Sequence, residues 1–337
     1  MTRDRLIAYI QATGEQAREL RAEADLCRAA VMGDAVHLRG IIEFSNHCRR
    51  HCAYCGLRAE NGAVRRYRMT PEEIVAAARH AEALGMRTVV LQSGEDDWWT
   101  AGRLADVIAR IRTETPLAVT LSVGERPEED YRLWREAGAD RFLLKHETAD
   151  PELYATLHPD GTLAQRVRCL EVLAELGYQI GTGCIVGLPG QTVESLADDL
   201  LLARSLNVHM AGIGILIPHA DTPLAQLPPG SAQTNLNMMA LARLLIPDLL
   251  LASTTALETG MPGGRLAGLQ AGGNVIMPNA TPRKYAADYD IYPGKAAPKD
   301  MIERDVARAR DVIALAGRYV ATDPGHSPRC PVADRPA

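Results

Sequence analysis

Three cysteines lie within eight residues of this 337-residue chain, Cys48, Cys52 and Cys55, in the spacing C-x3-C-x2-C. We expect no export signal, and the cytosol keeps thiols reduced, so this crowding favours a metal centre over a disulfide framework. A cubic iron–sulfur cluster is normally closed by four thiolates. Three cysteines therefore predict a cluster in which one iron is free to bind a group that is not protein.

Composition limits what can surround this loop. The chain is 47% hydrophobic and 23% charged, enough for a large core, and its length suits one α/β barrel with extensions or two ordinary domains. The net charge of −5 and the pI of about 6.0, without a run of Lys or Arg, argue against nucleic acid or an acidic membrane as partner. Residues 1–5 lead into a mixed polar helix, and no apolar run is long enough to span a bilayer. We expect a soluble, cytoplasmic protein with a small-molecule partner.

Strand-like and helix-like stretches alternate along most of the chain. The predicted strands are residues 37–44, 88–91, 118–123, 141–144, 179–186, 213–217, 249–253 and 274–277. The predicted helices are residues 3–30, 71–84, 103–111, 127–137, 164–176, 193–206 and 236–245. Such alternation implies parallel strands, and eight units favour a closed (βα)8 barrel over the alternative, a six-stranded open sheet with a small C-terminal domain.

Polar clusters follow the predicted strands, and the cysteine loop follows the first of them. The others are residues 92–96, 124–125, 145–148, 187–192, 218–223, 254–255 and 278–279. Loops after the strands of a (βα)8 barrel share one end, which carries the chemistry in enzymes of this fold. The sequence therefore predicts one polar mouth that includes the three thiols.

The cysteine loop, with Tyr54 just before the last cysteine, resembles that of the radical S-adenosylmethionine (SAM) superfamily. Within it, residues 35–295 resemble the HydE family of [FeFe]-hydrogenase maturases, with biotin synthase and methylornithine synthase as near relatives. The strings that carry this resemblance are RGIIEFSNHCRRHCAYCGLR (39–58), LQSGED (91–96), KHETADPELYATLHP (145–159), IVGLPGQT (185–192), IPHADTPLA (217–225) and NVIMPNATP (274–282).

This resemblance implies a domain plan, a chemistry and partners. Residues 1–35 would be a helical extension, 36–295 the barrel and 296–320 a helix, whereas the Pro- and Gly-rich composition of residues 321–337 predicts a disordered tail that includes Cys330. One [4Fe-4S] cluster on the three cysteines would bind SAM at its open iron and split it to methionine and a 5'-deoxyadenosyl radical. The substrate would be a small iron–carbonyl–cyanide–cysteine complex from a HydG-like partner, HydF-like maturases would take part, and a ferredoxin or flavodoxin would supply the electron.

The resemblance also suggests residue roles. Ser93, Gly94 and Glu95 match a stretch that binds the amino group of SAM, Glu147 an acid that hydrogen-bonds SAM, and Arg166 a partner of its carboxylate. The full set that faces the cofactor is Tyr54, Ser93, Gly94, Glu95, Ser122, Glu147, Arg166, Gly183 and Ile185. The set that faces the substrate is Gln92, Thr120, Ser122, Lys145, Thr254, Thr255, Met277 and Tyr292. A lining rich in donors suits an anionic complex in a desolvated cavity.

Some features depart from the family pattern. No cysteine follows the Tyr-Pro-Gly-Lys stretch at 292–295 until Cys330, so we expect no second iron–sulfur cluster. Gly190 stands where the superfamily often has an acid, and Lys145 stands where some relatives have Arg. A single ammonium would contact an anion at one point, whereas a guanidinium would contact it at two.

Two alternatives to the maturase stay open at this point. A related radical SAM enzyme could act on an organic substrate, as a mutase resembling methylornithine synthase or a sulfur insertase resembling biotin synthase. Alternatively, His47 and His51 could join the cysteines in a four-coordinate zinc site, which would make the protein a binding module or a hydrolase. A structural zinc loop would not explain the polar clusters after the other strands.

Overall fold

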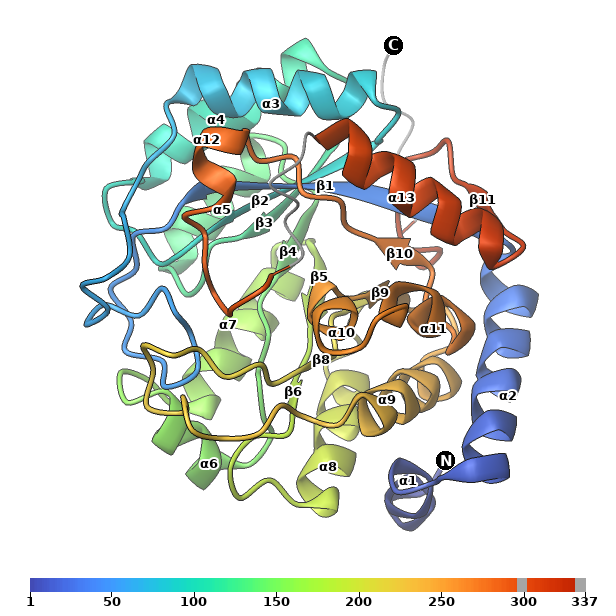
Figure 1. Cartoon of the computed structure of the whole chain (residues 1–337). Helices are drawn as coiled ribbons and strands as arrows, with labels where there is room; N and C mark the ends of the chain where they lie inside the picture. Colours follow the sequence, from blue (N-terminus) through green and yellow to red (C-terminus); the bar gives the residue numbers. More distant parts are fainter. Residues whose placement is uncertain (296–301, 331–337) are drawn as a thin grey trace.

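Parallel strands close into a barrel in the computed structural model, which describes residues 1–295 and 302–330. Within those ranges, eight strands form the ring, and β10 pairs back with β1 to close it (Figure 1). In order around the ring they are β1 (Ala35–Ser45), β2 (Thr88–Ser93), β3 (Ala118–Ser122), β4 (Arg141–Leu143), β5 (Gln179–Thr182), β7 (Met210–Ala211), β9 (Leu250–Ser253) and β10 (Val275–Ile276). The predicted (βα)8 barrel is confirmed, and the open sheet is wrong.

Helices cover the outside of this ring. They are α3 (Pro71–Ala83), α4 (Ala101–Glu114), α5 (Glu128–Glu136), α6 (Pro151–Leu157), α7 (Leu163–Glu175), α8 (Val193–Ser205), α9 (Ala232–Leu245), α10 (Thr255–Gly260), α11 (Gly264–Gln270), α12 (Arg283–Ala286) and α13 (Ile302–Leu315). The start of α3 is as predicted, with a capping box between Thr70 and Glu73 and a proline at the first helical position. Across the described ranges, no helix combines the length and apolarity needed to cross a bilayer.

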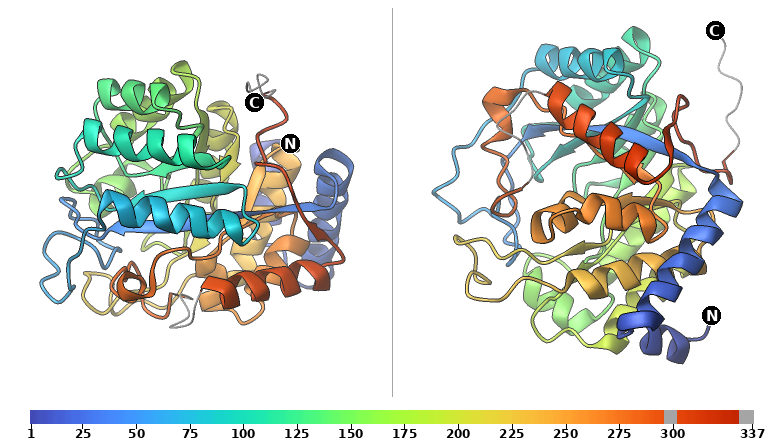
Figure 2. Two further views of the ribbon diagram at one scale, coloured as in Figure 1. Left: turned by 90° about the horizontal axis from the view of Figure 1, so that it is seen from above. Right: turned by 45° about the vertical axis from the view of Figure 1, so that its right-hand side comes forward.

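The N-terminal extension is two helices, α1 (Arg3–Ile10) and α2 (Gly14–Met32), where the sequence predicted one. Buried Asn237 on α9 explains the break, because its amide nitrogen donates to the carbonyls of Tyr9, Ile10 and Ala12 at the end of α1. The two dark-blue helices lie along the outside of the barrel beside α9 (Figure 2).

Two of the predicted strands are wrong in detail. Residues 179–186 form β5 and a separate β6 (Ile185–Val186), and the sixth ring strand is β7, whereas β8 (Gly214–Ile215) pairs with β6 outside the ring. The cause is a close approach of two backbones, since a Cβ on Gly183 would lie 2.0 Å from the carbonyl oxygen of Gly212. The hydrogen-bonded pairing of the strands is interrupted where these two glycines meet, so β5 with β7 and β6 with β8 form separate pairs.

The segment expected to begin a disordered tail is instead packed. After α13, β11 (Tyr319–Val320) pairs with the start of β1, and residues 321–330 cross the N-terminal ends of the ring strands. The carbonyl of Pro324 accepts hydrogen bonds from Thr88 (2.8 Å) and Arg141 (2.9 Å), and that of Gly325 accepts one from Arg39 (3.1 Å). We call residues 321–330 the plug. Its Pro- and Gly-rich composition suggested disorder, but its carbonyls are acceptors for buried side chains; residues 331–337 lie outside the described part.

We expect a chain that ends at Val320 to be destabilised, because buried side chains such as Arg39 lose acceptors that cost about 1–3 kcal/mol each. Its midpoint of thermal unfolding should fall by about 5–10 °C. A chain that ends at Cys330 keeps the whole plug and is the matched control. Equal midpoints for the two truncated chains would contradict a stabilising role for the plug.

Candidate active site at the mouth of the barrel

A cavity of about 310 Å³ opens at the C-terminal ends of the ring strands, and all three cysteines of the loop line it. The other predicted site residues that line it are Tyr54, Gln92, Ser93, Gly94, Glu95, Ser122, Lys145, Glu147, Arg166, Ile185 and Tyr292. They come from the cysteine loop, from the ends of β2, β3 and β4, from β6, from α7 and from the segment after α12. The structure therefore brings together most of the individually predicted site residues. Of the polar clusters predicted at this mouth, those at 187–192, 218–223, 254–255 and 278–279 contribute no residue to the described lining.

The environment of the cysteines fits a metal centre. Burial raises the pKa of the Cys48 and Cys52 thiols and raises that of Cys55 to about 12. Thiols in such a place become thiolates only beside a strong positive charge, which the irons of a cluster would supply. The backbone N–H of Glu95 already points at the Cys48 sulfur, 3.4 Å away, as N–H groups do around cluster sulfurs.

Gly94 allows the loop after β2 to lie directly against the cysteine loop. A Cβ at this position would lie 2.3 Å from the carbonyl oxygen of His47 and 2.7 Å from the Cβ of Cys48. No side chain could be accommodated there without moving the cysteine loop. Gly94 thus sets the distance between the cysteine loop and Glu95, whether or not the backbone of Gly94 also binds a ligand.

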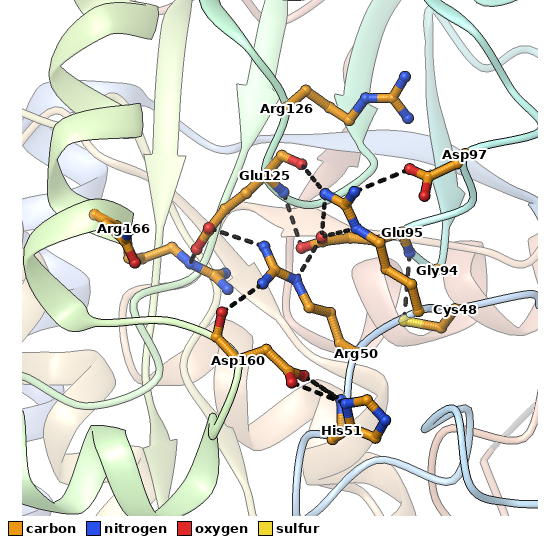
Figure 3. Close-up of polar contacts among 12 residues, drawn as sticks. Cys48, Arg50, His51, Gly94, Glu95, Asp97, Glu125, Arg126, Asp160 and Arg166 are labelled. Carbon is orange, nitrogen blue, oxygen red and sulfur yellow. Dashed lines mark hydrogen bonds and ion pairs between the residues drawn. The ribbon is translucent and has the colours of Figure 1, made fainter.

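A chain of alternating charges crosses the mouth beside Cys48 (Figure 3). The buried Glu95 carboxylate accepts hydrogen bonds from Arg50 (2.5 Å), from Arg49 (3.3 Å) and from the backbone N–H of Glu125 (3.0 Å). Glu125 in turn accepts from Arg50 (3.0 Å) and from Arg166 (2.6 Å). An ammonium group that binds Glu95 would share its carboxylate with Arg50.

Arg166 on α7 is held at two points of its guanidinium. Its Nε donates to Glu125, and one Nη donates to the carbonyl of Lys145 at 3.0 Å. Because the group is fixed and also lines the cavity, it is a preorganised donor for a carboxylate. It also ties α7 to the loop after β4.

That loop presents Glu147 in an unusual backbone conformation, with φ of 65°. Burial opposes the charge on its side chain, but Lys145, whose Nζ lies 2.8 Å from the carboxylate, outweighs burial and lowers the pKa of Glu147. Glu147 is therefore an anion at neutral pH, and it shares the cavity with its cationic neighbour.

Tyr54 of the cysteine loop is anchored by His158. The Nδ1 of His158 faces the carbonyl of Tyr154 (3.3 Å) and donates to it, so Nε2 is left to accept from the Tyr54 hydroxyl at 2.9 Å. Burial lowers the pKa of His158 to about 4, which keeps the ring neutral at neutral pH. The backbone N–H of Ala53 also donates to Leu157 (2.9 Å), so the loop is fixed to the end of α6.

Some predicted residues lie elsewhere. Of the described residues around the cavity, none is Thr120, Gly183, Thr254, Thr255 or Met277. Thr120 is buried within β3, Gly183 packs on Gly212, and Met277 packs beside Met210 and Leu250. The Thr254 hydroxyl caps α10, whose first residue is Thr255. These residues lie near strand ends, as the prediction required. However, a shift of one residue along a strand moves a side chain to the other face of the sheet or to a different depth in the barrel.

Several lining residues had been given no role. Glu125 was noted only as a polar strand end, and Arg50, His158, Tyr289 and Ile291 were not singled out. The position of Arg50 between two cysteines was the available signal. Tyr289 and Ile291 come from an irregular segment after α12, and no periodic pattern marks such a segment.

Comparison with known proteins assigns the family. The Radical SAM superfamily model matches residues 42–203. The HydE subunit of the [FeFe] hydrogenase maturase from Thermotoga maritima is 50% identical over 305 residues, which cover 90% of this chain and 86% of that protein. The chain belongs to the HydE family. It is a radical SAM enzyme, and this family uses an iron–sulfur cluster and SAM.

More distant relatives share the fold of this HydE-family chain. The 3-methylornithine synthase of Methanosarcina acetivorans is 29% identical over 90% of this chain and 84% of its own length. The crystal structure of methylornithine synthase has a TM-score of 0.85 at 24% identity and covers 95% of this chain and 94% of that one. HydG from Carboxydothermus hydrogenoformans has a TM-score of 0.81 at 21% identity and covers 94% of this chain and 75% of that one.

Family membership overturns the zinc hypothesis. The ring of His51 is also turned to Asp160, with Nδ1 2.8 Å from its carboxylate, at the outer edge of the loop. Among the described residues, no three His, Cys, Asp or Glu side chains are grouped closely enough to hold a single metal ion.

The buried His158 makes a prediction about pH. Between its pKa of about 4 and the ~6.5 of a histidine in an unfolded chain, the folded protein binds fewer protons, so stability falls as the pH drops through that window. From about pH 7 to about pH 5 this contributes a loss of about 2 kcal/mol. The variant His158→Gln keeps an acceptor for Tyr54 but has no group that titrates in this window. Between the same two pH values, its free energy of unfolding should therefore fall by about 2 kcal/mol less than that of the parent, as measured by urea denaturation of the cluster-free chains. Equal losses would contradict a neutral, buried His158.

Proposed function

We propose that this chain is a maturase of [FeFe]-hydrogenase that acts on a small iron–carbonyl–cyanide–cysteine complex on the way to the diiron subcluster. The observation that carries the proposal is the 50% identity to a HydE subunit over 90% of the chain, combined with a cavity that has three thiols at its rim. The 3-methylornithine synthases and the biotin synthases are 27–30% identical, so an organic substrate is the weaker alternative.

Cys48, Cys52 and Cys55 would hold one [4Fe-4S] cluster. When bound, the cluster supplies the electron that splits SAM into methionine and a 5'-deoxyadenosyl radical. Ser93, Gly94 and Glu95 would bind the amino group of SAM, Arg166 its carboxylate, and Glu147 a further polar group. The contacts of Glu95 and Arg166 to fixed neighbours support this, because both groups are already oriented.

The substrate would lie deeper in the cavity, beside Gln92, Lys145 and Tyr292. These polar groups stand among the apolar side chains of Leu143, Ile215 and Ile291. A few oriented donors in an apolar cavity suit a small anionic complex, because the cavity excludes water and each hydrogen bond to the anion is therefore stronger. Lys145 would contact the anion at one point.

We propose a single cluster. The other four cysteines lie on four separate parts of the fold: Cys27 on α2, Cys169 on α7, Cys184 after β5, and Cys330 in the plug. The electron would come from a ferredoxin or flavodoxin, a HydG-like maturase would supply the substrate, and HydF-like maturases would take part. A cytoplasmic location fits a site that depends on reduced thiols.

The cluster assignment is tested by Cys52→Ala in the anaerobically reconstituted full chain. With dithionite and SAM, we expect the parent to form 5'-deoxyadenosine and the variant to form at least about 100-fold less, because one of three thiolates is lost. Cys27→Ala, in a cysteine away from the cavity, is the matched control. Undiminished 5'-deoxyadenosine from Cys52→Ala would contradict the mechanism.

The maturase role is tested through Lys145. In a strain that lacks its own HydE, the parent gene should restore [FeFe]-hydrogenase activity. Lys145→Met should restore at least about tenfold less, because a charge-assisted contact to an anion is worth about 1.5–3 kcal/mol. Lys145→Arg keeps the charge and should retain most of the activity. Failure of the parent gene in that strain, with SAM cleavage intact, would favour an organic substrate.

A further inference from the structure

A buried polar cluster lies behind the wall of the cavity, between the loop after β4 and helix α8. It consists of His146, Thr182, Cys184 and Asp199, each at most 2% exposed. Within the described part of the chain, none of the four lines the cavity of the site. Buried polar groups cost stability unless they are satisfied, so a cluster of this kind requires a reason.

The hydrogen bonds fix where the protons are. The Thr182 hydroxyl donates to the carbonyl of Leu144 (3.0 Å), so its oxygen must accept from the backbone N–H of His146 (3.1 Å) and from Nδ1 of that ring (2.9 Å). Nδ1 therefore carries a hydrogen. The Nε2 of His146 faces a carboxylate oxygen of Asp199 at 3.4 Å, a long contact that is attractive when a proton lies between the two atoms.

Asp199 holds the same turn at a second point. The oxygen that faces His146 also accepts the backbone N–H of Ala149 at 2.5 Å. Residues 146–149 are thus held at both ends by one side chain of α8, and the N–H of Thr148 closes the turn onto the carbonyl of His146 at 2.8 Å.

Glu147 lies inside this turn, in the left-handed backbone region. That conformation costs a residue with a Cβ about 1–2 kcal/mol, so it persists only where the surroundings enforce it. The backbone of Glu147 is also bonded to Gly183 and Ile185, both at 3.0 Å. Together these bonds leave the side chain directed at Lys145 and the cavity.

We propose that His146 and Asp199 are positioning residues: by holding both ends of the 146–149 turn, they keep Glu147 in its left-handed conformation and its carboxylate in the cavity. This inference rests on the proposed role of Glu147 in SAM binding. Burial raises the pKa of Asp199, although His146 opposes this, and a shared proton fits both effects.

The test uses two substitutions of Asp199 in the reconstituted full chain, with SAM as the probe. In Asp199→Asn, the amide oxygen can still accept from Ala149, but the contact with Nε2 of His146 falls on the same atom and loses its shared proton. We therefore expect KM for SAM to rise by at most about threefold, because one of the two contacts is kept. Asp199→Leu keeps the volume and loses both bonds, and we expect KM for SAM to rise at least about tenfold, with iron content unchanged.

A double-mutant cycle separates positioning from a general structural role. If Asp199 acts through Glu147, Asp199→Leu has no further effect on KM for SAM in a Glu147→Ala background. An equal rise in both backgrounds, or no rise in the parent background, overturns the proposal.

Thr182→Val keeps the proposal testable if Asp199→Leu does not fold. It removes the acceptor of His146 Nδ1 with little change of shape, and we expect a smaller rise in KM that also vanishes in the Glu147→Ala background. A folded Thr182→Val chain that binds SAM as the parent does overturns the proposal. If the parent itself cleaves no SAM, the proposed function fails instead.

Discussion

The mouth of the barrel depends on the alternation of charge from Glu95 through Arg50 and Glu125 to Arg166. These side chains come from the cysteine loop, the ends of two strands and helix α7, and they are largely removed from water. A buried charge without its partner costs several kcal/mol, so each of these groups fixes the place of the next. The cysteine loop has little regular structure of its own, and this chain of ion pairs holds it above the cavity.

The two ends of the barrel satisfy the hydrogen bonds of their buried charged groups in different ways. At the N-terminal ends of the strands, the buried Arg39 and its neighbours are closed off by carbonyls of the plug, which leaves that end packed. At the C-terminal ends, the charged groups satisfy one another around an open space. The stable end and the chemical end of the fold therefore differ in what completes their hydrogen bonds: backbone in one case, and paired side chains in the other.

A site of this kind needs neighbouring groups that hold its loops in place. His158 holds Tyr54 through one neutral nitrogen, and the pair of His146 and Asp199 holds the turn that carries Glu147. In both places a buried histidine whose Nδ1 donates to a neighbouring oxygen helps to fix the position of a loop. Function in this protein thus depends on such supporting groups as well as on the residues that are proposed to bind SAM.

The sequence by itself determined the barrel and the cysteine loop, because strand period, capping residues and ligand spacing are local properties. Most of the lining, including Arg166 and Tyr292, was predicted through the resemblance of the sequence to a known family. It could not show that residues 321–330 are a plug, since their composition carries no pattern and their partners are up to 286 residues away. Nor could it separate Thr120 and Met277 from Gln92 and Lys145, because depth inside a barrel depends on the stagger of neighbouring strands. Only the tertiary structure decided which polar groups share the cavity and which lie buried behind its wall.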